Sequence, residues 1–461
     1  MDVNWNDDSR ATVLVGLGMV PEVGDLLSAL VGVLWDSSDD VWGEIRAQVE
    51  ALITQKISDL VYSDVQAALN GLKQNVALYL QNLRDVSDPS TIKDQWITTF
   101  NLFLHDEPFF VKDGYQLLLL PLYAQFMNLK LSLLRDVILF GKSWGFNSQN
   151  IDSYQKSYMT PSVQQAMAYA NELDQTQFAY LTTNTRRDDH RAEPFRTLNR
   201  YNRSMTLMVR DFVQMWPYFD PSQYPSPVQV ALDREIFSDP YGSCDNGGPI
   251  QNHLPDSPKG TIVGMSIWGG DRLDSIQVGY TKNGAPDGGD STGKMGGPGG
   301  SNLPPRGGRF PVDADDPIVK VVCRSGDVVS GVRFRFASGK STRGFGGMNG
   351  GDDYDVSFDD HYLCRVHVGG RSVFYGQCIE CLVFGFKLRA TKSVGRMVQQ
   401  RFFVTSPTQV TSQTFGAKLG LGEANLLHLE PGDEKSLIAK RLQFATKLAQ
   451  WSVKTALLPE R

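Results

Sequence analysis

The most apolar stretch of the chain runs from Tyr115 to Gly145 and predicts a helix that is hydrophobic on nearly all sides. Its twenty residues from Pro121 to Phe140 would form an α-helix of roughly 30 Å, which matches the hydrocarbon thickness of a bilayer. Such a helix is either the buried centre of a helical bundle or a membrane span. Its three charges each cost about 2.5–3.5 kcal/mol near a bilayer centre and therefore favour the bundle: Lys130, Arg135 and Asp136.

Most polar side chains of this stretch fall on one side of the predicted helix. At 100° per residue they form a narrow stripe, with Leu, Phe, Met and Val around the rest. A helix of this kind could be stored inside a bundle and later line a pore, with the stripe facing water and the leucines facing lipid. The candidate pore-lining residues are Gln125, Asn128, Lys130, Ser132, Arg135 and Asp136.

Apolar residues spaced three and four apart predict further helices up to about residue 220. The expected segments are Pro21–Trp35, a run from Trp42 to Leu83 with a break near Tyr62–Asp64, Thr91–Leu104, Thr160–Leu181 and Phe195–Trp216. Amphipathic helices around one apolar helix predict a bundle with a buried central member. The turn expected at His105–Gly114 contains two adjacent acids, Asp106 and Glu107, which would favour cations at the mouth of a pore.

The second half of the chain changes character at Cys244, where glycine becomes frequent and helical periodicity disappears. Short segments of alternating polarity predict strands with one buried face. Several short strands at even spacing suggest an all-β sandwich, barrel or prism. The expected strands are Ile262–Trp268, Leu273–Tyr280, Ile318–Cys323, Val332–Phe336, Leu363–Val368 and Ile379–Phe386.

Composition and charge narrow the possible partners. The net charge of -6 and the lack of a basic patch with interleaved aromatics predict no binding to nucleic acid. Met1–Asp8 lacks the basic start of a signal peptide, so we expect storage in the producing cell or non-classical release.

The odd count of five cysteines, irregularly spaced, argues against a disulfide scaffold. Cys378 and Cys381 form a CxxC in an expected strand, where they would point to opposite faces, so a zinc or redox role is disfavoured.

Catalytic motifs do not emerge from the sequence. Gly288–Met295 nearly matches a phosphate-binding loop, but Met295 replaces the required hydroxyl and more glycines follow where a helix must start. There is no HExxH. His361 and His367 are near neighbours, but a structural role is the commoner one. We therefore expect no catalytic residues, no metal and no cofactor, and hence no enzyme.

Three long blocks in the first 240 residues closely resemble the pore-forming first domain of the three-domain insecticidal crystal toxins, the delta-endotoxins. They are Gln48–Ile57, Leu119–Gly145 and Asn202–Pro240, in the order and spacing of that family. Lys130 departs from the pattern, since the family more often has histidine there. The resemblance implies a helical bundle whose hairpin, Thr91–Leu104 with Leu117–Phe140, inserts into a membrane.

The following segment resembles the jacalin-related lectins, which fold as a three-sheet β-prism. The matching residues are Gly260–Gly284, Met295–Gly300, Arg343–Gly347 and Val366–Phe384. The toxin family's own second domain is also a β-prism, so the two resemblances agree. In the lectins a GxxxD motif holds the sugar; Val373 and Gln377 stand at those two positions here, so the motif is lost in form. Candidate receptor or sugar loops carry Asp352, Asp353, Tyr375 and Gln377, whose alternative role is to cap turns.

The expected organisation is therefore multidomain, with α and β parts. A helical domain (residues 1–240) is followed by a β-prism (241–388) and a C-terminal extension (389–461). Within the extension, Asp433–Leu458 predicts an amphipathic helix that binds a membrane surface or, more commonly, packs onto the prism. The extension is shorter than a third domain of the toxin type.

The resemblance implies a pore-forming insecticidal toxin. Its prism would bind a receptor or glycan on the target-cell membrane, and its helical hairpin would insert, with a monomer in solution becoming a homo-oligomer in the membrane. Arg186, Arg187 and Arg191 are candidate protease sites, although a solvated loop is the commoner meaning. The alternative is a carbohydrate-binding, lectin-type protein whose helical domain is a scaffold that does not insert.

Overall fold

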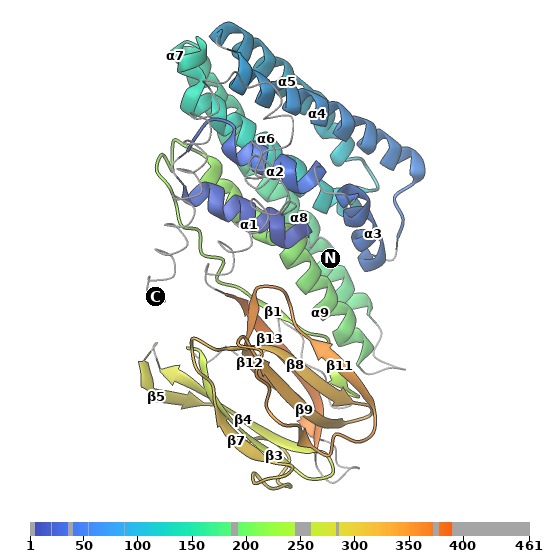
Figure 1. Ribbon diagram of the computed structural model, residues 1–461. Coiled ribbons are helices and arrows are strands. Elements are labelled where there is room, and N and C mark those ends of the chain that lie inside the picture. The colour runs from blue at the N-terminus through green and yellow to red at the C-terminus, as the bar shows by residue number, and fades with distance from the viewer. Residues whose placement is uncertain are drawn as a thin grey trace, which may run out of the picture. The chain divides into compact units, whose positions relative to one another are not determined.

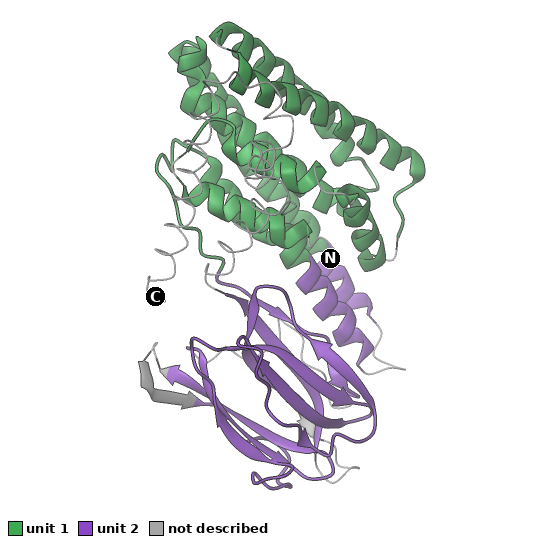
Figure 2. Ribbon diagram, viewed as in Figure 1, with its two compact units in different colours: residues 1–176, 205–232, 390–458 green, residues 177–204, 233–389, 459–461 purple. Residues whose placement is uncertain are grey.

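The computed structural model describes residues 5–19, 21–35, 40–53, 55–86, 88–185, 192–244, 260–282, 285–371 and 378–389. The chain divides into two compact units, coloured separately in Figure 2. Among the described residues, the first unit comprises those up to 176 together with 205–232, and the second comprises 177–204 together with 233–389. The helix expected at Asp433–Leu458 lies outside the described residues.

The helices lie in the first part of the chain (Figure 1). They are α1 (Trp5–Gly18), α2 (Asp25–Trp35), α3 (Val41–Ile53), α4 (Asp59–Asp85), α5 (Pro89–Phe110), α6 (Gln116–Phe140), α7 (Ser148–Ser153), α8 (Thr160–Asn184), α9 (Glu193–Met205) and α10 (Asp211–Met215). Short 3₁₀ segments, η1 (Gly141–Trp144) and η4 (Trp216–Phe219), and π-helical segments, η2 (Tyr154–Met159) and η3 (Thr206–Arg210), link some of them.

Helix α6 is the central helix of the first unit. Every residue from Leu118 to Val137 is buried, and α6 packs against α2, α3 and α5. A helix buried on all sides must be apolar on all sides, which is what the composition of this stretch predicts. The expected helical bundle with a buried central member is therefore confirmed.

Local capping moves several helix ends away from their predicted positions. Ser58 accepts a hydrogen bond from the Val61 amide and starts α4, so the chain breaks after Ile53 and the expected break near Tyr62–Asp64 is wrong. Asp88 and Pro89 likewise start α5. Helix α5 continues to Phe110, so the first six residues of the expected turn at His105–Gly114 are helical.

Other helix starts differ only in part from the expected ones. Helix α2 begins at Asp25, after Pro21, and α1 was not expected. Helix α8 begins at Thr160 as expected, but it continues a helical path that runs from Ser148 through η2, and the Thr160 hydroxyl donates to Asp220 over 3.1 Å. The last expected helix is confirmed as a continuous helical path from Glu193 to Met215.

The second unit contains three antiparallel sheets, as expected of a β-prism. The first has the order β1 (Glu235–Phe237), β13 (Ile379–Leu388), β12 (His361–Arg371), with β2 (Tyr241–Gly242) also paired to β13. The second has the order β10 (Phe345–Gly346), β9 (Val329–Phe336), β8 (Ile318–Ser325), β11 (Asp352–Val356). The third has the order β5 (Ala285–Ser291), β4 (Leu273–Lys282), β3 (Ile262–Gly269), β7 (Gly308–Pro311), with β6 (Met295–Gly296) also paired to β4.

All six expected strands are present. Alternation buries Met265 and Ile267 of β3, and a bulge between Ile262 and Gly264 brings Ile262 to the same buried side, while β13 is buried on both of its faces. A disulfide joins Cys244 to Cys381 of β13 and packs against Phe195 and Leu198 of α9. The irregular cysteine spacing did not predict this bond.

Candidate functional site

Among the described residues, one helical segment, Gln116–Trp144, is long and apolar enough to cross a membrane, and 94% of its most apolar window is buried. The core helix of a globular protein satisfies the same criteria, so length and composition do not separate the two possibilities. The polar side chains of α6 and their partners carry more information. All six candidate pore-lining residues are buried: Gln125, Asn128, Lys130, Ser132, Arg135 and Asp136.

An amide–indole contact fixes the middle of α6. The Oδ1 of Asn128 accepts from Trp216 Nε1 over 2.9 Å, and its Nδ2 donates to Gln125 Oε1 over 3.2 Å. Asn128, Gln125 and Trp216 are all fully buried. A buried polar group without a partner costs about 1–3 kcal/mol, so these groups hold one another in place. The Ser132 hydroxyl donates to the Asn128 carbonyl within the helix, over 2.7 Å.

Lys130 is paired within the α5–α6 hairpin. Its Nζ lies 2.7 Å from Glu107 Oε2, and the Tyr123 hydroxyl donates to the other oxygen of Glu107 over 3.4 Å. The Lys130 side chain is 4% exposed and that of Glu107 is 28% exposed. The ammonium is therefore the more deeply buried partner, and it depends on this one carboxylate for its counter-charge.

Arg135 is held by the end of a helical segment. Its Nη1 donates to the carbonyl oxygens of Phe219 over 3.1 Å and Tyr218 over 3.4 Å. These two residues end η4, where carbonyl groups lack helical partners and the local potential is negative. A guanidinium is suited to this position because it presents several donors at once.

Asp136 binds two other helices through its two oxygens. Oδ1 accepts from the Gly24 amide, just before α2, over 3.2 Å, and Oδ2 accepts from the Tyr79 hydroxyl of α4 over 3.1 Å. A carboxylate at a helix N-terminus meets unpaired amides and the positive end of the helix dipole. Burial raises the pKa of Asp136 to about 7, against the opposing effect of these hydrogen bonds. Burial and this carboxylate raise the pKa of Tyr79 well above its usual range, so the phenol remains a donor.

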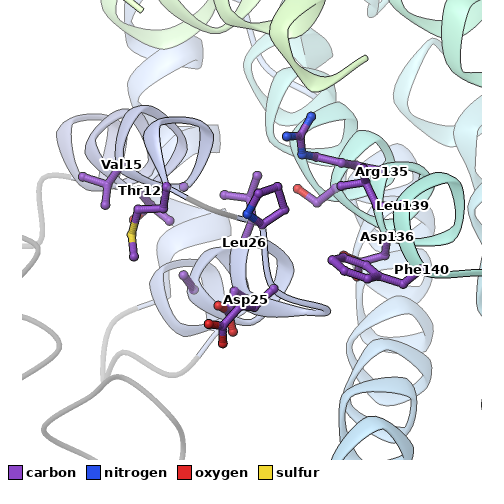
Figure 3. Close-up of a pocket in the computed structure, with 14 residues that line it drawn as sticks. Thr12, Val15, Asp25, Leu26, Arg135, Asp136, Leu139 and Phe140 are labelled. Carbon is purple, nitrogen blue, oxygen red and sulfur yellow. The ribbon is translucent and has the colours of Figure 1, made fainter. Parts of the chain in front are cut away.

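Asp136 also lines a small pocket between α1, α2 and α6. Figure 3 shows Arg135 and Asp136 of α6 across this pocket from Val15 of α1 and Asp25 of α2. Its volume is about 40 Å³, enough for water but not for an organic ligand. We therefore assign the pocket to the packing of α6 and not to ligand binding.

The side-chain contacts of α6 differ in kind from one neighbouring helix to the next. Toward α5 they are mostly aromatic: Phe126 stacks on Phe110 with ring centroids 4.4 Å apart, and Trp96 Nε1 donates to the Leu133 carbonyl over 3.0 Å. Toward α2, α4 and η4 they are the polar contacts of Asn128, Arg135 and Asp136. Sequence reasoning missed these polar partners, because a helical projection gives the face of a residue but not what lies opposite.

The other expected site residues are placed as follows. Asp106 and Glu107 lie in the last turns of α5, where Asp106 is buried and its Oδ1 lies 2.7 Å from Nδ1 of His105. Asp352 and Asp353 are exposed on β11 at the edge of its sheet, and Asp353 lies 3.7 Å from Arg324. Five others lie outside the described residues: Arg186, Arg187, Arg191, Tyr375 and Gln377.

Histidines and cysteines do not converge on a metal site in the part of the chain that the structure describes. No group of three or more His, Cys, Asp or Glu there could hold an ion. His361 is buried and contacts Arg234 through Nε2 over 2.6 Å. His367 lies six residues along the same strand, about 20 Å away at the rise of a strand.

The described residues thus combine a helical bundle that has a buried, partly polar central helix with three antiparallel sheets that follow it in the chain. Residues 12–220 match the family model of the delta endotoxin N-terminal domain. The helical part of this chain is therefore similar to the delta endotoxin N-terminal domain.

Relatives and solved structures agree with this assignment. The chain is 29% identical to the pesticidal crystal protein Cry1Id of Bacillus thuringiensis over 318 residues, 60% of this chain and 43% of the relative. It is 34% identical to Cry7Ab of Bacillus thuringiensis subsp. dakota over 221 residues, 46% of this chain and 18% of the relative. These matches span less than half the length of either relative.

Two solved structures share the fold. A tryptic core variant of Bacillus thuringiensis Cry1Da gives a TM-score of 0.69 at 21% identity, covering 84% of this chain and 74% of that one. PirB gives a TM-score of 0.67 at 13% identity, and the match covers 84% of this chain and 94% of the PirB chain. At these identities the likeness establishes the fold alone.

Proposed function

We propose that this protein is a pore-forming toxin of the pesticidal type. Its prism binds a receptor or glycan on the target-cell membrane, and its α5–α6 hairpin then inserts into that membrane. One observation carries the proposal: Asn128, Arg135 and Asp136 of α6 are paired with η4, α4 and the residue before α2, while an aromatic stack and an indole hydrogen bond join α6 to α5.

This division of contacts suits a hairpin that leaves the bundle as a unit. The Phe110–Phe126 stack, the Trp96–Leu133 hydrogen bond and the Lys130–Glu107 ion pair all lie within the hairpin and can survive the move. The contacts that must break are those of Asn128, Arg135 and Asp136. Polar groups released in this way need new polar partners, and inside a bilayer these are found at a water-filled lumen.

The role of each residue follows from its place on the hairpin. Asp106 and Glu107 lie close to the α5–α6 turn and would stand at a mouth of the pore, where their charge favours cations. Several copies of the hairpin are needed to surround a lumen, so the monomer becomes a homo-oligomer in the membrane. The lumen is lined by Gln125, Asn128, Ser132, Arg135 and Asp136, while Lys130 stays paired with Glu107 inside the hairpin.

Dye release from liposomes tests the activity. The full chain is added to dye-loaded vesicles before and after mild trypsin treatment, alone and with a variant in which Arg186, Arg187 and Arg191 are changed to Gln. Leakage is expected, with the variant resistant to any activation by trypsin. No leakage under any condition would reject the proposal. Strong glycan binding without leakage would favour a lectin-type protein with a scaffold domain.

Thiol labelling tests the lining. Ser132→Cys and Leu134→Cys place one new thiol on opposite sides of the same helix, 200° apart at 100° per residue. A charged methanethiosulfonate should change the conductance of Ser132→Cys pores and leave Leu134→Cys pores unchanged. The wild-type chain corrects for its own thiols, and labelling that affects Leu134→Cys instead would reject the assigned face.

A further inference from the structure

A furrow crosses the outer face of the sheet formed by β5, β4, β3 and β7, whose labels appear in Figure 1. It is open to solvent and has a volume of about 540 Å³, which is within the usual range of ligand sites. The strand register sets out its lining in two rows. One row contains Gly264, Gly279 and Ser291, and the other contains Arg309, Ser266 and Gln277.

The floor of the furrow is made by two paired glycines. Gly279 does not have a positive φ, and a Cβ there would meet nothing closer than 3.6 Å. Neither the backbone nor the packing therefore requires glycine at this position, although glycine weakens a strand. Gly264 is tighter, since its Cβ would lie 3.2 Å from the Phe310 carbonyl oxygen. Together the two glycines leave a strip of bare backbone, a feature typical of sites where a ligand approaches closely.

The wall beside this floor is polar. Gln277 Nε2 donates to Ser291 Oγ over 2.7 Å, which orients the amide, and the Ser266 hydroxyl lies between Gln277 and Arg309 in the register. The described residues that line the furrow include one cation, Arg309, and no carboxylate. The wall therefore offers hydroxyl, amide and guanidinium groups, which can both donate and accept hydrogen bonds.

The sheet itself limits what can bind. Strand β3 is paired with β4 and β7, and β4 is paired with β3 and β5, so their backbone groups are engaged in ladders. A peptide cannot extend this sheet from its middle as it would from an edge. Recognition must come from the side chains and the flat glycine floor. Ligands rich in hydroxyl groups suit the side chains, and the C–H face of a sugar ring suits the floor.

We propose that this furrow binds an oligosaccharide that lies across β3 and β4. The inference rests on the proposed function, in which the prism recognises the target cell. It moves recognition from the positions expected from the sequence, Asp352, Asp353, Tyr375 and Gln377, to the face of a sheet.

The test measures binding of the full chain to a printed array of neutral and acidic oligosaccharides, followed by calorimetric titration of the best binder. Gly279→Val fills the furrow, and Gln277→Ala removes the amide. Gly326→Ala is a matched control. Gly326 lies in the β8–β9 turn, away from the furrow, and a Cβ there would meet nothing closer than 3.5 Å. Arg333→Ala removes an exposed polar group from β9 of another sheet. Both furrow variants should bind at least tenfold more weakly, and both controls should bind within twofold of wild type.

Three outcomes would overturn the proposal. The array could reveal no sugar that binds, Gly279→Val could bind with unchanged affinity while folded, or a peptide from a random library could bind the wild type and not this variant. The last result would assign the furrow to peptides. Thermal unfolding of each variant confirms that it is folded. The binding assay contains no membrane, so its failure and a failure of dye release are independent results.

Discussion

Tyr79 of α4 donates a hydrogen bond over 3.1 Å to the carboxylate of Asp136 on α6, and both side chains are buried. The other oxygen of Asp136 accepts from the Gly24 amide before α2. One carboxylate thus joins the central helix to two helices that come earlier in the chain. In the proposed mechanism both hydrogen bonds break when the hairpin leaves, so they stabilise the stored form.

Removing the Tyr79 hydroxyl should weaken the bundle. Tyr79→Phe keeps the ring but leaves one oxygen of a buried carboxylate without its donor, at a cost of about 1–3 kcal/mol in the free energy of unfolding. Urea denaturation of the helical domain measures the change. The same variant should release dye from liposomes faster than wild type, because the closed form is less stable.

Tyr169→Phe is the matched control for this prediction. The Tyr169 hydroxyl of α8 is buried and has no hydrogen-bond partner among the described residues. Its removal should therefore change the free energy of unfolding little, or raise it. Equal destabilisation by both substitutions would mean that the Tyr79–Asp136 hydrogen bond contributes nothing specific.

The Lys130–Glu107 pair predicts an asymmetry between two single substitutions. Glu107→Gln leaves an ammonium that is 4% exposed without a counter-charge and should cost about 3–5 kcal/mol. Lys130→Met leaves a carboxylate that is 28% exposed, which water can solvate in part, so it should cost clearly less. Denaturation of both single variants and the double variant gives the coupling energy. Equal costs for the two single changes would contradict the burial that the structure assigns to each partner.

The sequence predicted the features that are local or strongly periodic. Helix α6 was identifiable because its apolar residues are continuous, and the strands were identifiable because alternation marks one buried face. Several misses were also local: Ser58 is a good N-cap, and it would have placed the start of α4 correctly. The strands that were missed, such as β2, β6 and β10, have two residues each, too few to show a period.

The partners of the polar face could not be predicted in the same way. Trp216 meets Asn128 across 88 residues of sequence, and Tyr79 meets Asp136 across 57. Helical periodicity places Asn128 and Asp136 on one face of α6 but does not say which helix covers that face. Val76 and Leu80, close to Tyr79 in the sequence, are also buried, so the sequence does not single out Tyr79 as the partner. The choice among them is made by tertiary packing.

His367 predicts a loss of stability in acid. Burial, with Arg365 as the second cause, lowers the pKa of His367 from 6.5 to about 4. Because the unfolded state then binds more protons, stability present above about pH 6.5 is lost as the pH falls toward 4. His367→Gln should remove about 1–2 kcal/mol of this loss, after allowance for screening at a partly exposed site. Urea unfolding at pH 7.5 and pH 4.5 measures it, and a wild type and variant that lose equal stability would contradict the shifted pKa.

The disulfide between Cys244 and Cys381 predicts that the prism is sensitive to reduction once it unfolds. The bond closes a loop across 137 residues and lies among Phe195 and Leu198 of α9, with both cysteines buried. Cross-links that close long loops restrict the unfolded chain, and their removal typically costs about 2–5 kcal/mol.

Replacing both cysteines by alanine should therefore lower the midpoint of thermal unfolding of the prism. In dithiothreitol the wild type should unfold at the same midpoint temperature as the double variant. The midpoint of the double variant itself should not change when dithiothreitol is added. Cys323, Cys364 and Cys378 remain as buried thiols in both proteins, which makes the comparison specific for the one bond. An equal response of the double variant to the reductant would place the sensitivity elsewhere in the prism. Unchanged midpoints in all samples would mean that the packing around Phe195 and Leu198, and not the covalent bond, holds this part of the prism together.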